Sequence, residues 1–156
     1  MRENSLQAKI KQAVIDAMRA KDKPSLSIAR VISAEIKNLE KIKDPNSKIA
    51  LTEEEILTLL MGMIKKREDS IAHFLKAKRD DLVAIEKNQI DLLNRFLPEQ
   101  MSIELLSKLV KEHIKAIDAK SMADIPKVLA LLKPKILGKA KISDLMQILK
   151  KNLNAS

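Results

Sequence analysis

Apolar residues recur along the chain at about the 3.6-residue spacing of an α-helix, and no stretch alternates apolar and polar residues as a half-buried strand would. The chain has only two glycines, Gly62 and Gly138. Tight hairpin turns need residues that tolerate positive φ, so this glycine poverty argues against β structure. Phe74 and Phe96 are the only aromatic residues, so the core must be aliphatic. We predict an all-α protein.

Helix start and stop signals divide the chain into amphipathic segments. The clearest start is Thr52, which can cap the first free N–H groups, with Glu55 three residues later to complete a capping box. Leu51 and Ile56 occupy the two positions of a hydrophobic staple. Pro134 is expected to close the sixth helix. The predicted helices cover about 5–20, 24–42, 52–75, 80–97, 102–117, 125–132 and 143–153.

The apolar positions of these helices also predict which side chains face inward. The predicted inward faces include Met18, Leu75, Ile85 and Leu105, each at helical spacing from other apolar residues. Asp80 or Asp81 is expected to cap the fourth helix.

Polar residues in the third and fourth predicted helices suggest two kinds of contact. Lys65 and Asp69 have the i, i+4 spacing of an ion pair. Polar residues on or near the apolar stripe of the fourth helix can hydrogen-bond to an arginine across the helix pair. The residues concerned are Glu86 and Gln89 as partners, and Arg67 and Arg79 as arginines.

Pro98 is a strong stop, because proline disfavours helical geometry at the preceding Leu97. We predict a helical N-terminal domain over 1–97 and a small compact helical domain over 98–156, with Leu97, Pro98 and Gln100 as a structural hinge. The charge is uneven across this boundary. Residues 1–96 carry 19 basic and 15 acidic side chains, whereas residues 97–156 carry 11 basic and 6 acidic ones.

Short charged runs flank the predicted turn between the third and fourth helices, and another run surrounds Pro98. The combination of these runs is specific. The runs are Lys66-Arg67-Glu68-Asp69-Ser70, Lys76-Ala77-Lys78-Arg79-Asp80-Asp81-Leu82, Leu97-Pro98-Glu99-Gln100 and, nearer the N-terminus, Ala34-Glu35-Ile36-Lys37-Asn38. Together they resemble the GatB/YqeY family over essentially the whole chain, except that Lys78 stands where that family usually has a glycine.

The resemblance implies an N-terminal helical domain followed by a small helical domain. That second domain is similar to the tail of the B subunit of the tRNA-dependent Asp/Glu amidotransferase, where the tail engages tRNA. The family carries the label of a carbon–nitrogen ligase with glutamine as the amido-nitrogen donor.

The sequence itself does not predict an enzyme that acts alone. Two isolated glycines cannot form a glycine-rich phosphate cradle, and the absence of cysteine excludes thiolate nucleophiles and zinc–thiolate sites. His73 and His113 lie about forty residues apart on different predicted helices, and we interpret them as ordinary surface or half-buried histidines. We predict no catalytic residue, no metal site and no cofactor.

The most basic part of the chain is its C-terminal end, where from position 120 onward only Asp124 and Asp144 oppose the lysines. We predict an RNA-binding surface there. It has no aromatic residue for base stacking, so recognition must use phosphate charge and RNA shape, which suits a folded RNA such as tRNA. The predicted RNA-binding residues are Lys120, Lys127, Lys133, Lys135, Lys139, Lys141, Lys150 and Lys151.

Two function classes therefore stay open. The first is a non-catalytic tRNA-binding or amidotransferase-associated accessory protein, with tRNA, the amidotransferase or other translation components as partners. The second is a helical protein–protein interaction adaptor with no RNA role. We expect no membrane partner, because the sequence has no apolar run of 18 residues, and a cytoplasmic location, because the N-terminus lacks a signal-peptide pattern.

Overall fold

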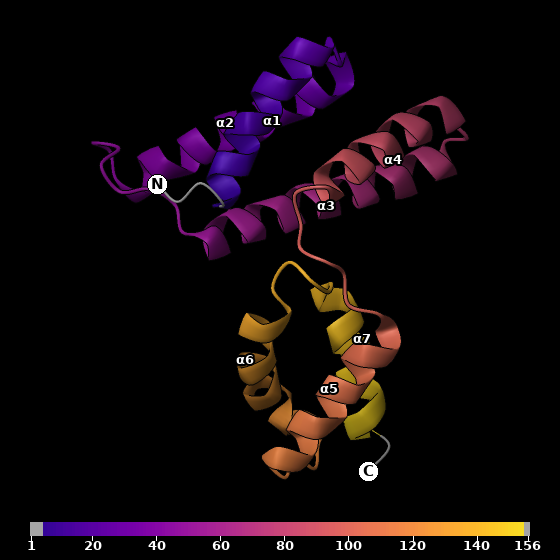
Figure 1. Ribbon diagram of the computed structural model, residues 1–156. Coiled ribbons are helices and arrows are strands. Elements are labelled where there is room, and N and C mark those ends of the chain that lie inside the picture. Colours follow the sequence, from indigo (N-terminus) through magenta and orange to yellow (C-terminus); the bar gives the residue numbers. More distant parts are fainter. Residues whose placement is uncertain (1–4, 155–156) are drawn as a thin grey trace. The chain divides into compact units, whose positions relative to one another are not determined.

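The computed structural model describes residues 5–154, and within that range it contains helices and no strand (Figure 1). The all-α prediction is confirmed. The chain forms two compact units, Met1–Leu97 and Pro98–Ser156. The helices are α1 (Leu6–Ala20), α2 (Lys23–Lys43), α3 (Glu53–Lys76), α4 (Asp80–Asn94), α5 (Ile103–Ala116), the short 3₁₀ helix η1 (Met122–Asp124), α6 (Ile125–Ile136) and α7 (Ile142–Asn154).

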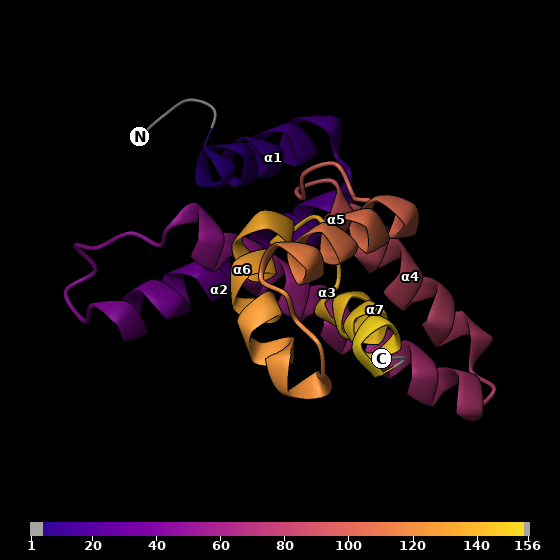
Figure 2. The same cartoon turned by 90° about the horizontal axis from the view of Figure 1, so that it is seen from below.

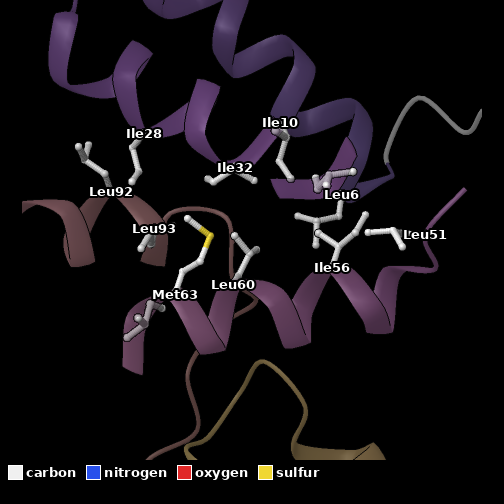
Figure 3. Packing of buried hydrophobic residues seen from close by; sticks show 12 residues of the cluster. Leu6, Ile10, Ile28, Ile32, Leu51, Ile56, Leu60, Met63, Leu92 and Leu93 are labelled. Carbon is white, nitrogen blue, oxygen red and sulfur yellow. The ribbon is translucent and has the colours of Figure 1, made fainter. Parts of the chain in front are cut away.

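The first unit is built from two helical hairpins, α1–α2 and α3–α4. In each hairpin the two helices lie side by side (Figure 1, Figure 2). Ile56 and Leu60 of α3 point toward Ile10 of α1 and Ile32 of α2, and Leu93 of α4 closes the same core (Figure 3). Burying each of these aliphatic side chains contributes about 1.5–3 kcal/mol, so the core that joins the hairpins is the main stabilising element of this unit.

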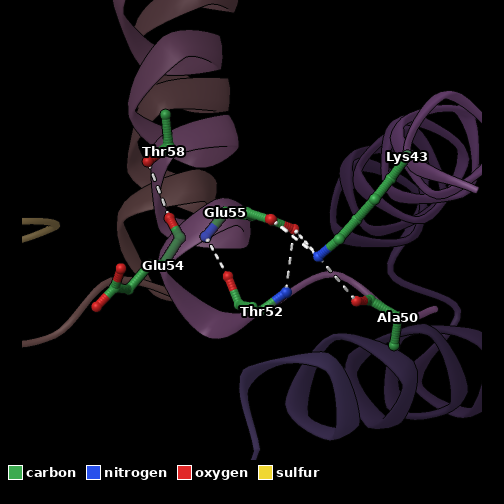
Figure 4. A network of polar contacts seen from close by, with 6 residues as sticks. All are labelled: Lys43, Ala50, Thr52, Glu54, Glu55 and Thr58. Atoms are coloured by element: carbon green, nitrogen blue, oxygen red, sulfur yellow. Dashed lines mark hydrogen bonds and ion pairs between the residues drawn. The ribbon is translucent and has the colours of Figure 1, made fainter.

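The start of α3 has the predicted capping box (Figure 4). The Thr52 hydroxyl accepts a hydrogen bond from the Glu55 N–H at 3.1 Å, and the Glu55 carboxylate accepts one from the Thr52 N–H at 3.2 Å. Lys43, at the end of α2, donates to the same carboxylate at 2.9 Å and to the Ala50 carbonyl at 3.3 Å. The Lys43 hydrogen bond is the main reason that the pKa of Glu55 is lowered. This network closes the link between α2 and α3.

The turn between α3 and α4 differs from the prediction at its cap. The N-cap residue is Arg79, which makes no side-chain cap, and Asp80 and Asp81 lie in the first turn of α4. Asp81 instead pairs with Arg79 at 3.0 Å, and this hydrogen bond lowers its pKa. Lys78 has φ 57, the left-handed conformation that glycine adopts most easily.

Two of the predicted polar contacts of the α3–α4 hairpin are present, Arg67 with Gln89 and Lys65 with Asp69, whereas Arg79 pairs with Asp81 and not across the helix pair. Arg67 of α3 donates from Nε to the Gln89 side-chain oxygen of α4 at 2.9 Å, and from a terminal nitrogen to the Met63 carbonyl at 3.1 Å. Lys65 and Asp69 form an i, i+4 ion pair at 3.7 Å on the exposed side of α3. Of these contacts, only the Arg67–Gln89 hydrogen bond joins α3 to α4.

Four of the apolar side chains that were predicted to face inward are more than half exposed. The helices bury a narrower stripe than the apolar pattern suggests. In α4, Val83, Leu92 and Leu93 are buried, whereas other apolar residues lie beside that stripe. The exposed residues are Met18 (54%), Leu75 (55%), Ile85 (53%) and Leu105 (53%).

The second unit is a small bundle in which α5 packs against both α6 and α7. Helix α6 continues through Pro134 to Ile136, so the prediction that Pro134 closes it is wrong. Pro134 lacks the N–H that would bond to the Ala130 carbonyl, and both residues lie on the exposed side of α6. Ile136 is fully buried, and its packing holds the last turn in place.

Candidate nucleic-acid interface

The core of the second unit determines which residues face solvent. Apolar side chains at helical spacing in α5, α6 and α7 pack together, including the fully buried Val110, Leu132 and Leu145. The residues between them point outward, and all eight lysines of the predicted RNA-binding surface are exposed. Their exposure fits a binding surface and an ordinary solvated surface equally well. The way in which the lysines are grouped is therefore what separates the two interpretations.

Four of the eight lysines lie close together in the chain where α6 ends and α7 begins. Lys133 and Lys135 are in the last turn of α6, and Lys139 and Lys141 are in the link that follows. The run 133–141 contains no acidic residue. Gly138 has φ 77 and turns the backbone back. This compact group of four lysines is called the α6–α7 lysine cluster below.

Residues of the predicted hinge make contacts in one unit or the other. Leu97 packs against the core of the first unit. Gln100 donates from its side-chain nitrogen to the Gly138 carbonyl at 2.7 Å and to the Pro98 carbonyl at 3.0 Å. The Met101 N–H donates to the Lys139 carbonyl at 2.8 Å. The segment before α5 therefore fixes the backbone of the α6–α7 link.

The other four lysines lie toward the opposite end of the second unit (Figure 1). Lys120 and Lys127 are near the start of α6, and Lys150 and Lys151 are near the end of α7. A 12-residue helix such as α6 is about 18 Å long, which separates its two ends by more than a Debye length at physiological salt. The structure thus groups four of the predicted residues and separates the remaining four from them.

One lysine of the cluster has a partner that sequence reasoning missed. The Lys135 ammonium lies 2.8 Å from Nε2 of His113, and Nδ1 of His113 lies 2.9 Å from the Leu109 carbonyl. Because a carbonyl only accepts, Nδ1 carries the proton, and Nε2 accepts from the ammonium. The bond joins α5 to α6 and requires a neutral imidazole. No pattern signals it, because the two residues are 22 positions apart.

The two acidic residues of this region act at helix starts. The Asp124 carboxylate accepts hydrogen bonds from the Lys120 N–H at 2.9 Å and the Ser121 N–H at 3.2 Å. These bonds lower the pKa of Asp124, so it is charged at neutral pH. Asp144 lies in the first turn of α7, where a negative charge is favourable. Neither residue is in the run 133–141. No negative side chain within that run therefore offsets the positive charge of the α6–α7 lysine cluster.

The two histidines lie on different helices of the described residues. His73 is exposed on α3, and His113 is half-buried on α5. Within residues 5–154 no group of three or more histidine, aspartate or glutamate side chains is placed to hold a metal ion. In the same range no helix is long and apolar enough to cross a membrane.

The chain is therefore an all-helical protein with a helical-hairpin unit and a small, basic helical bundle. It belongs to the YqeY-like protein family, whose model matches residues 7–153. An uncharacterized protein of Schizosaccharomyces pombe is 38% identical over 98 residues, which are 63% of this chain and 76% of that protein. Altered inheritance of mitochondria protein 41 is 32% identical over 118 residues in Pyrenophora tritici-repentis and 31% identical over 116 residues in Candida glabrata.

The two mitochondrial relatives are matched over 74% and 73% of this chain but over only 63% of their own length. Their names place them in mitochondria, which contradicts our prediction of a cytoplasmic location. That prediction used only the composition of the first residues. A folded helical core has the same physical chemistry in the cytoplasm and in mitochondria. The rest of the sequence therefore contains no information that could correct the predicted location.

Proposed function

We propose that this protein is a non-catalytic accessory protein that binds a folded RNA such as tRNA through the α6–α7 lysine cluster. The supporting observation is the presence of four exposed lysines within 133–141, a run without an acidic residue. Lysine is a compact point charge that suits phosphate oxygens, and several such charges close together release condensed counterions when RNA binds. The amidotransferase or other translation components are the protein partners that this role would require.

The surroundings of the cluster favour recognition by charge and shape. The second unit has no Phe, Tyr or Trp side chain on which an unstacked base could lie, and its histidine, His113, is half-buried and hydrogen-bonded to Lys135. Gln100 and Met101 hold the backbone of the link that carries Lys139. A fixed backbone keeps the attachment points of neighbouring lysine side chains constant, which limits where their ammonium groups can lie and favours the regular phosphate spacing of a structured RNA over a flexible strand.

The test is a salt titration of tRNA binding by the full chain. About five lysine–phosphate contacts give a slope near −3.5 to −4.5 when log affinity is plotted against log salt. A first variant changes the α6–α7 lysine cluster to glutamine, and a matched variant changes the four lysines at the other end of the unit to glutamine. The first set is Lys133, Lys135, Lys139 and Lys141, and the second is Lys120, Lys127, Lys150 and Lys151.

We expect the cluster variant to lose most of the slope, to about −1, and the matched variant to keep a slope close to that of the unchanged chain. Because Lys135 also bonds to His113, Lys135→Gln alone is measured by circular dichroism to separate loss of binding from loss of structure. Equal losses in the two four-lysine variants would show that RNA responds only to net charge. Salt-insensitive binding in all three proteins would rule out the proposal.

A further inference from the structure

A groove runs between α1 and α2 of the first unit and takes no part in the proposed RNA binding. Its volume is about 530 Å³, and it is open to solvent. Ile10 of α1 and Ile36 of α2 form its buried floor, and the apolar surface that a ligand can reach comes from the half-buried Val14 of α1 and the exposed Ala34 of α2. At one end, the Gln7 side-chain nitrogen donates to the Glu40 carboxylate at 3.1 Å, which joins the two helices there.

The charged residues that line this groove are mostly basic. Lys11 of α1 and Arg30 and Lys37 of α2 line it, and all three are exposed. Glu40 is the one acidic residue that lines it, and its carboxylate already accepts the Gln7 hydrogen bond. The groove therefore combines an apolar lining with an excess of positive charge.

The apolar lining continues along α1 beyond the groove. Met18 follows Val14 by four residues and so lies one turn further along the same face of the helix. Its side chain is 54% exposed, although it is large and apolar. Methionine is common on surfaces that bind helices, because its unbranched side chain adapts to the partner. Val14 and Met18 are therefore neighbouring apolar residues on one face of α1.

We propose that this groove binds an acidic amphipathic helix of a partner protein. Apolar side chains at i, i+4 and i+7 of that helix would lie against Val14, Met18 and Ala34, while carboxylates at flanking positions would pair with Lys11 and Arg30. This is the helix-in-groove mode of recognition, with charge setting the orientation.

The charge and the lining distinguish this occupant from two others. RNA phosphates would pair with the basic residues, but they would leave Val14, Ala34 and Met18 facing a polar backbone, and no aromatic residue lines the groove for base stacking. A second copy of the chain carries the same net charge of +9 and would be repelled. An acidic helix satisfies both the apolar and the charged parts of the groove.

The probe is a fluorescein-labelled peptide of about 15 residues, near the shortest length at which an isolated helix holds in water. It has leucine at i, i+4 and i+7 and glutamate at the flanking positions. Two control peptides are a scrambled order of the same residues and a version with lysine in place of glutamate. Binding to the full chain is measured by fluorescence anisotropy, and the site is mapped by NMR amide shifts of the isotope-labelled chain.

The groove variant is Lys11→Glu with Arg30→Glu and Lys37→Glu. The matched variant, Lys9→Glu with Lys66→Glu and Lys87→Glu, makes the same change in charge at exposed positions that do not line the groove. Circular dichroism confirms that both variants keep their helices.

We expect the acidic peptide to bind in the micromolar range, as small transient interfaces do, and to shift amides of residues 7–18 and 30–40. The groove variant should bind at least about tenfold more weakly, and the matched variant within about twofold of the unchanged chain. The proposal is overturned if the scrambled peptide binds as well, if the shifts lie elsewhere, or if the acidic peptide does not bind. It is also overturned if the groove variant loses tRNA affinity as strongly as it loses the peptide, because RNA would then be the occupant.

Discussion

Replacing Leu132 with alanine should strongly destabilise the second unit and leave the stability of the first unit unchanged. Leu132 is fully buried in the core formed by α5, α6 and α7, and no residue of the first core belongs to that cluster. The substitution removes three carbons, or about 2.4 kcal/mol of transfer free energy, and the cavity left behind brings the loss to about 3 kcal/mol. A helical core of fewer than about 70 residues rarely supplies more than 3–5 kcal/mol. The loss therefore removes most of the stability of this unit.

The neighbouring residue provides the control. Leu131 is 46% exposed, so Leu131→Ala removes the same atoms from a surface position and should cost less than about 1 kcal/mol. The assay is urea unfolding of the full chain, followed through NMR amide signals assigned to each unit. With a slope near 1 kcal/mol per molar urea, the midpoint of the second unit should fall by about 3 M in the Leu132 variant.

The reasoning fails in either of two cases. If Leu131→Ala shifts the midpoint as far as Leu132→Ala does, burial does not decide the cost. If the signals of the first unit move together with those of the second, the two cores unfold as one cooperative structure.

Three further predictions concern helix ends. Thr52→Ala removes the cap of α3 and the acceptor for the Glu55 N–H, and it should lower the unfolding free energy of the first unit by about 1 kcal/mol in urea unfolding. Lys78→Gly relieves the left-handed conformation at φ 57, and thermal unfolding should show it to be more stable than the unchanged chain by about 0.5–1 kcal/mol. Asp124 has a lowered pKa, so its contribution is present above about pH 4 and is lost as pH falls through its folded pKa. The stability difference between the unchanged chain and Asp124→Ala should therefore shrink below about pH 4, which unfolding midpoints at several pH values will measure.

Local signals of the sequence predicted local structure well. The capping box at Thr52 depends on residues three positions apart, so the sequence contains all the information that determines it. The Lys65–Asp69 ion pair is equally local. The Arg67–Gln89 contact was predictable because an antiparallel hairpin of two long helices leaves few partners for a polar residue near its apolar stripe.

Features that depend on packing between helices were predicted less well. Ile85 and Leu105 lie at helical spacing from buried residues, but the width of the buried stripe depends on which neighbour a helix meets, and that is not written in its own residues. Pro134 has the signature of a helix end, yet the burial of Ile136 outweighs the loss of one hydrogen bond on the exposed side. The Lys135–His113 bond requires the packing of α5 on α6 to be known.

The two proposed binding surfaces show why a count of basic residues does not identify a partner. Lys11 and Lys37 line a groove with apolar surface, so a ligand that contacts their charges also meets Val14, and a partner with both apolar and acidic groups satisfies the site. Lys139 and Lys141 lie in an acid-free link whose backbone is held by hydrogen bonds, so a ligand there meets clustered charge. The side chains have the same chemistry in the two places. Their neighbours determine whether binding is driven by desolvation of apolar surface or by release of counterions. The two driving forces respond differently to salt, because only counterion release gives a plot of log affinity against log salt whose slope counts the phosphate contacts.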